Sequence, residues 1–124
     1  MSITKQTIIL CIGHLPSHIH GKVDLLRAEG FEHAVPIVLS DTTVDAVKAL
    51  ILTCPPGSLF LAGGAMDKVY PEATADLYAY IAEYAPAMLV HKVSFADFPE
   101  GTVAPVSAEV VAQAAVAVAL KMLA

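Results

Sequence analysis

Short apolar runs alternate with longer amphipathic segments four times along this chain. The runs occupy residues 7–12, 34–39, 58–62 and 87–93. They are continuous rather than alternating with polar residues, which is typical of strands buried on both faces. Strands of this kind occur in parallel sheets that have helices on both sides, so the pattern predicts an α/β fold.

Helical spacing of apolar residues predicts a helix after each of these runs, over residues 16–30, 44–54, 71–85 and 107–123. Pro16 and Pro71 suit a first helical turn, and Gly30 suits a C-terminal cap. Ahead of the second helix, Thr42 and Asp45 have the spacing of a capping box. Ser107 supplies a capping oxygen for the last helix.

This order predicts one α/β domain over residues 1–124, a three-layer Rossmann-like or flavodoxin-like parallel sheet with helices on both faces. We expect four strands, and consider a short fifth at residues 102–104. Pro36 lies within the second strand, and proline cannot donate to a strand ladder, so this strand should lie at an edge of the sheet.

The last predicted helix is apolar around most of its circumference. Its polar residues Glu109, Gln113 and Lys121 are spaced by multiples of four and form one narrow stripe. Such a helix must be covered on more than one side, by the sheet and either a second subunit or neighbouring helices of the same chain. We expect a homodimer through this helix, and dimerisation or docking without catalysis is one hypothesis for the function.

Composition and charge narrow the classes of partner. Hydrophobic residues make up 56% of the 124 residues and charged residues 15%, and 12 acidic against 7 basic residues give a net charge of −5. The basic residues are scattered, which argues against nucleic-acid binding. The C-terminal segment is too interrupted by polar residues for a membrane span.

The two cysteines and the N-terminal segment indicate a cytoplasmic location. Cys11 lies inside an apolar run and Cys54 precedes a proline, so neither belongs to a CxxC pair or a disulfide framework. Residues 1–7 contain no basic region of the kind that opens a signal peptide. We expect reduced thiols and no export signal.

Candidate site residues follow the strands, where ligands of open parallel sheets bind. The residues that we assign to a ligand site are Gly13, Ser17, Ser40, Asp41, Gly63, Gly64, Asp67 and Tyr70. The first hypothesis is a small-molecule or anion-binding domain, with its ligand between the His14 loop and the loop of Gly63 and Gly64. Backbone N–H groups of the glycine loop could face a phosphate or carboxylate, although a Walker lysine and a GxGxxG motif are missing.

Histidines gather at the same edge, and they suggest a second hypothesis. His14 and His91 are the candidate general bases or metal ligands of a small enzyme, with His18 as a further weak metal candidate. His18 and His20 point about 200° apart around a helix, so at most one of them joins His14. A metal shell would need more ligands, and neither HExxH nor paired CxxC motifs are present. The cofactor, the substrate and the presence of a metal therefore stay open.

Ile12, Gly13 and His14 resemble the Gly-His at a strand end of short cobalt or nickel chelatases. The resemblance covers three residues and implies a chelatase-like alternative within the enzyme hypothesis; a hydrolytic enzyme is the other. A phosphoacceptor receiver domain is excluded, because glycines and a histidine occupy the places where that domain needs acidic residues.

Overall fold

The computed structural model describes residues 2–124 and confirms the alternation of strands and helices. The strands are β1 (Ile9–Gly13), β2 (Ala34–Val38), β3 (Leu59–Ala62) and β4 (Leu89–Lys92). The α-helices are α1 (Pro16–Ala28), α2 (Val44–Thr53), α3 (Met66–Val69), α4 (Pro71–Tyr84) and α5 (Ala108–Lys121). Two short 3-10 helices, η1 (Leu39–Asp41) and η2 (Phe95–Asp97), follow β2 and β4.

All four strands are parallel and lie in the order β2-β1-β3-β4. This is the order of the first four strands in flavodoxin-like sheets, and it reverses direction between β1 and β3. The edge position predicted for β2 is confirmed. The register aligns Cys11 of β1 with Pro36 of β2 and with Leu61 of β3.

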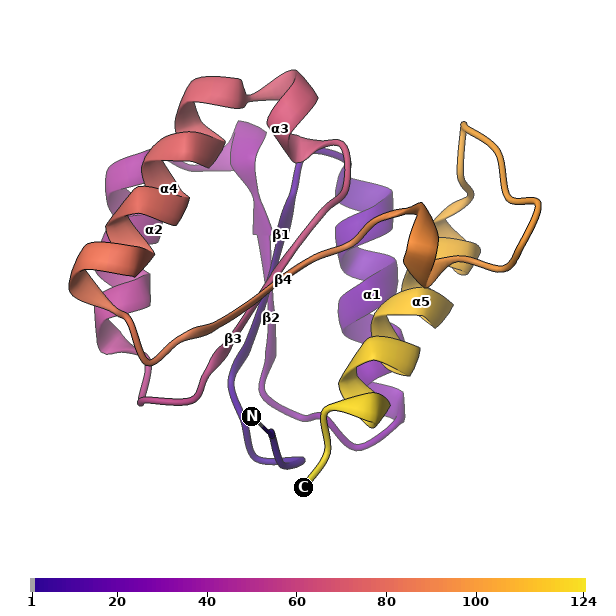
Figure 1. Ribbon diagram of the computed structural model, residues 1–124, viewed down its shortest axis with the longest axis horizontal. Helices are drawn as coiled ribbons and strands as arrows, with labels where there is room; N and C mark the ends of the chain where they lie inside the picture. Colours follow the sequence, from indigo (N-terminus) through magenta and orange to yellow (C-terminus); the bar gives the residue numbers. More distant parts are fainter. Residues whose placement is uncertain (1) are drawn as a thin grey trace.

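Helices cover both faces of the sheet and complete a three-layer α/β fold. In Figure 1, α2 and α4 lie on one side of the sheet, while α1 and α5 lie on the other. Side chains that alternate along β1 divide between two cores: Cys11 faces the core under α1 and α5, whereas Leu10 and Ile12 face the core under α2 and α4. The whole of β1 is buried, as its continuous apolar sequence predicts.

Within a single chain, α5 is already covered by α1 and the sheet. Seven of its residues are buried, and among them are Ala115 and Val118, which belong to the core shared with α1. Glu109, Gln113 and Lys121 lie on its exposed side, as predicted. The small alanines let the two helices pack closely, so the apolar surface of α5 does not need a second subunit. The homodimer stays a prediction.

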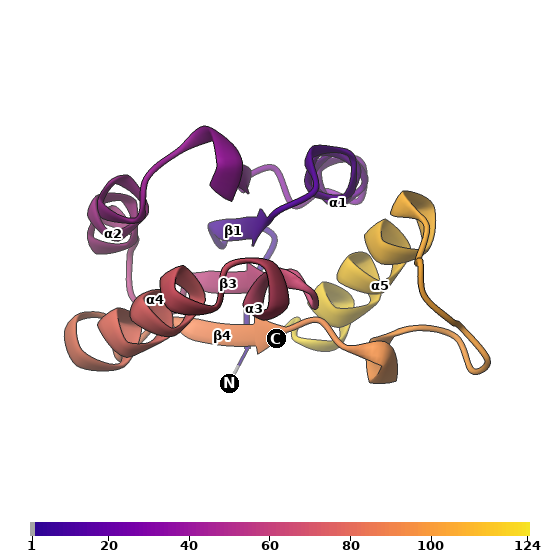
Figure 2. The same cartoon turned by 90° about the horizontal axis from the view of Figure 1, so that it is seen from above.

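The fifth strand considered at residues 102–104 is wrong. The chain turns at Gly101, which has a φ of 86°, and the N–H and hydroxyl of Thr102 both donate to the Pro99 carbonyl. These bonds close a local turn and leave the N–H unavailable for a strand ladder. The segment between η2 and α5 projects from the body of the domain in both views (Figures 1 and 2).

The ends of the predicted helices agree with the structure to within two residues, but one cap differs. Ser107 caps α5 by accepting a hydrogen bond from the Val110 N–H, as predicted. At α2 the cap is Thr43, which accepts from the Ala46 N–H, and not Thr42. Thr42 instead follows η1 in extended backbone, with a φ of −146° and a ψ of −179°, one residue too early to cap α2.

The two ends of the described chain meet beside the α1 and α5 core. Ile3 and Leu123 form an isolated parallel bridge, in which the Ile3 N–H donates to the Met122 carbonyl at 2.7 Å. Ile3 is 1% exposed and belongs to this core. Among residues 2–124, no helix has both the length and the apolar character that crossing a membrane requires.

Candidate functional site

Two glycines lie side by side where the strand order reverses. Gly13 ends β1, and Gly63 directly follows β3. The Gly63 N–H donates to the Ile12 carbonyl at 2.8 Å, and a Cβ added to Gly13 would lie 3.8 Å from the Gly63 Cα. Parallel sheets place their ligands outside the carboxyl ends of the strands at this point of reversal. The structure therefore brings together two of the glycines that the sequence assigned to a ligand site.

Lys22 reaches this pair of glycines from α1. The residue is 1% exposed, and its Nζ lies 3.9 Å from the position that a Cβ on Gly63 would take. Because Gly63 has no side chain, it presents only its backbone to the lysine nitrogen. A long helical side chain extends toward the N-terminal end of its helix, which here is the carboxyl edge of the sheet.

No carboxylate neutralises Lys22 among the described residues. The ion pairs of residues 2–124 are Lys48 with Asp76 and His91 with Asp97. Burial lowers the pKa of Lys22 below its ordinary value of 10.5, and the Cys11 thiol only partly opposes this. Within the described part of the chain, the charge of this buried side chain is thus left without an ion-pair partner.

His14 and His18 lie near Lys22 and are more exposed to solvent than the lysine. His18 and Lys22 are spaced four residues apart and lie along one side of α1, and His14 precedes the helix, close enough to His18 for its charge to act on it. Burial lowers the pKa of His18, and the charges of Lys22 and His14 lower it further. The charges of Lys22 and His14 thus oppose protonation of His18, and an anion beside these groups would offset that effect.

The N-terminus of α1 lies at the same edge of the sheet, and no acidic side chain balances its partial positive charge. Its N-cap is Leu15, which makes no side-chain hydrogen bond, Pro16 occupies the first position, and the first turn contains no acidic residue. The N–H groups of Ser17 and His18 have no partners inside the helix. Uncapped N–H groups at the positive end of a helix favour an anion, and Lys22 adds an independent reason for one.

Cys11 lies beneath Lys22 in the core. Burial raises the pKa of its thiol to about 12, against smaller opposing effects of Lys22 and Arg27. The thiol therefore stays protonated at neutral pH, and it behaves as an apolar core group rather than as a nucleophile.

Asp67 and Tyr70 do not join Lys22. Both belong to the α3 region over the other face of the sheet, where Tyr70 packs against the core of α2 and α4. Tyr78 is close to Asp67: burial, and then the charge of Asp67, raise the pKa of Tyr78 to about 12. Gly64 is exposed in the loop beside Gly63 and lies against the backbone carbonyl of Val93.

Ser40 and Asp41 also lie apart, in η1 at the outer edge of the sheet. Asp41 lines a cavity of about 320 Å³ between the start of α1 and α2, together with His20, Thr42 and residues of β2 and α2. His20 thus faces β2, whereas His18 lies close enough to Lys22 for the charge of the lysine to lower the pKa of His18. This cavity is separate from the pair of glycines.

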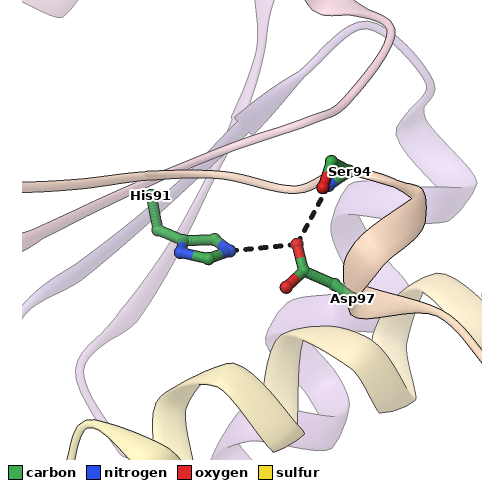
Figure 3. Close-up of polar contacts among 3 residues, drawn as sticks. All are labelled: His91, Ser94 and Asp97. Atoms are coloured by element: carbon green, nitrogen blue, oxygen red, sulfur yellow. Dashed lines mark hydrogen bonds and ion pairs between the residues drawn. The ribbon is translucent and has the colours of Figure 1, made fainter.

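His91 is bound to a carboxylate of its own. Its Nε2 lies 3.0 Å from the Asp97 Oδ2, which also accepts a hydrogen bond from the Ser94 N–H at 2.9 Å (Figure 3). Ser94 and Asp97 form a capping box around η2, so this contact fastens η2 to the edge strand β4. His91 is therefore joined to η2 rather than to His14 and His18. Among residues 2–124, no three His, Cys, Asp or Glu side chains are grouped so that they could hold a metal.

Lys22 is marked in the sequence by its place on α1, not by a place after a strand. Ile19, Val23 and Leu26 form the apolar stripe of α1, and Lys22 lies within that stripe. A charged residue on the buried side of a helix, with no acid at a spacing of three or four on that side, marks an unpaired buried charge.

The lowered pKa of Lys22 predicts a specific pH dependence of stability. The unfolded chain binds more protons than the folded protein between the folded pKa of Lys22 and 10.5, so its contribution to the free energy of unfolding rises with pH in that window. Wild type should therefore gain stability relative to Lys22→Met as the pH rises from neutral toward 10.5. Urea unfolding of both proteins at several pH values measures this gain, and a constant difference would contradict it.

Compared with known proteins, the chain matches no protein-family model, and no curated protein or solved structure is significantly similar to it.

Proposed function

We propose that this protein binds a small anion, a phosphate or a carboxylate group, between the loops that follow β1 and β3. The observation that carries the proposal is Lys22, which is buried beside Gly63 without a carboxylate partner. A buried cation costs several kcal/mol of desolvation unless an opposite charge accompanies it. A ligand that brings this charge recovers part of the cost on binding.

Three further features support an anion at this place. The uncapped start of α1 supplies N–H donors, His14 and His18 supply imidazole N–H groups, and Gly63 leaves room for close approach. The strand order places the site at the reversal point of the sheet. The anion would lie over Gly63, within reach of the α1 N-terminus.

A thermal-shift series with inorganic phosphate, acetate and simple phosphate monoesters tests the proposal. A ligand at roughly one hundred times its Kd should stabilise the folded protein by about 2.7 kcal/mol. For a domain of this size, that corresponds to an increase in Tm of about 10 °C. Ionic strength is held constant with sodium chloride, because general screening would otherwise contribute.

Gly63→Ala locates the site. An added Cβ meets the Ile12 carbonyl at 3.4 Å and the Lys22 Nζ at 3.9 Å, so it fits without a clash and fills the space over the lysine. We expect an intact fold and a much weaker response to the anion. Gly21→Ala is the matched control, because its Cβ meets only α5 atoms at 3.8 Å or more. An equal response of wild type and Gly63→Ala would exclude this site.

A further inference from the structure

Lys22 is in an environment that favours a nucleophilic amine. It is removed from bulk water, being 1% exposed on the buried side of α1, and its Nζ lies beside Gly63 without a carboxylate partner among the described residues. Desolvation favours the neutral amine, which is the form that attacks carbonyl carbon. An amine whose only task was to hold an anion would not need this environment.

The space beside Nζ restricts the size of a reacting group. Gly63 lies beside it, and a Cβ on Gly63 would already come within 3.9 Å of the nitrogen. The reacting group must therefore be small and planar, so that it can approach Nζ beside the glycine. The N–H groups at the start of α1 can then hold an acidic group attached to that carbonyl.

We infer that Lys22 forms an imine with a small carbonyl compound that carries an acidic group, the simplest class being the 2-oxo acids. This inference rests on the proposed anion site, which would bind the carboxylate. It adds a covalent step to that binding.

The step requires no partner beyond the ligand. The Lys22 nitrogen attacks the carbonyl carbon, a C–N bond forms, and the C=O π electrons pass to the oxygen. A proton moves from nitrogen to that oxygen, and after a second protonation the hydroxyl leaves as water while nitrogen forms the C=N bond. His18, at a spacing of four residues on the same side of α1, is placed to carry these protons.

Borohydride trapping tests the inference on the full chain. Wild type is incubated with pyruvate and sodium cyanoborohydride, which reduces an imine to a stable amine, and the adduct is located by peptide mass spectrometry. We expect one adduct per chain, at Lys22. It should be lost in Lys22→Met and kept in Lys68→Met, a matched variant of an exposed lysine in α3.

Further measurements distinguish a failure of the imine from a failure of the proposed anion site. Acetone has the carbonyl without the acid, and labelling of Lys22 by acetone as fast as by pyruvate would overturn the requirement for an acidic group. Stabilisation by phosphate and pyruvate without an adduct would overturn the imine and leave the anion site standing. If the adduct is spread over exposed lysines and persists in Lys22→Met, the inference is wrong.

Discussion

Lys22→Met is expected to make the protein more stable while removing its response to anions. Methionine has a similar length and no charge, so it fills the space between α1 and the sheet without the desolvation cost that the lysine carries. Replacing buried charge with apolar groups of similar volume typically stabilises a protein or leaves it unchanged. We expect a gain of about 1–2 kcal/mol in the free energy of unfolding at neutral pH.

The two effects are measured on the same samples, by urea unfolding with and without phosphate. Wild type should gain stability with phosphate, whereas Lys22→Met should start higher and gain little. Lys68→Met is the control for the loss of one positive charge, and it should behave like wild type in both measurements. If Lys22→Met instead destabilises the empty protein, the lysine has a structural partner and the argument for a ligand fails.

Gly64→Ala is expected to destabilise the fold by about 2–3 kcal/mol, an effect of the size seen when atoms are forced into packed backbone. A Cβ on Gly64 would lie 2.5 Å from the Val93 carbonyl oxygen, which belongs to backbone and cannot swing away. Val93 is itself held by the hydrogen bond from its N–H to the Ala62 carbonyl at 3.0 Å. Relief therefore requires that the loop after β3 move away from the end of β4.

Neighbouring glycines provide the comparison, since the same substitution at Gly63 meets nothing closer than 3.4 Å. Gly63→Ala should unfold near the wild-type urea concentration, and Gly21→Ala should gain about 0.5–1 kcal/mol from helix propensity. Midpoints from urea unfolding rank the three variants. Equal stability of Gly63→Ala and Gly64→Ala would show that the Val93 contact does not constrain the loop.

Much of the fold could be predicted because its signals are local. Continuous apolar runs identified the four strands, Pro36 identified the edge strand, and Ser107 marked the start of α5. The short helix α3 and both 3-10 helices could not be predicted in this way, because segments of three or four residues are too short to show a periodicity.

The candidate site could be predicted only in part. The rule about strand ends selected Gly13 and Gly63, which the proposed site includes, but it also selected Asp41, Asp67 and His91, which the fold distributes over the two edges and the opposite face of the sheet. The difference lies in which side of the sheet each loop turns to, and that depends on tertiary packing. The rule does not select Lys22, because this residue lies in the middle of α1 and reaches the edge of the sheet only with its long side chain.

The packing of α1 against α5 has a consequence for the proposed site. The helix that carries Lys22 lies between the sheet and α5, and its residues Ile19, Val23 and Leu26 share one core with Ala115 and Val118 of α5. The bridge between Ile3 and Leu123 lies beside the same core. The position of Lys22 therefore depends on residues 108–121, which are far from the site in the sequence.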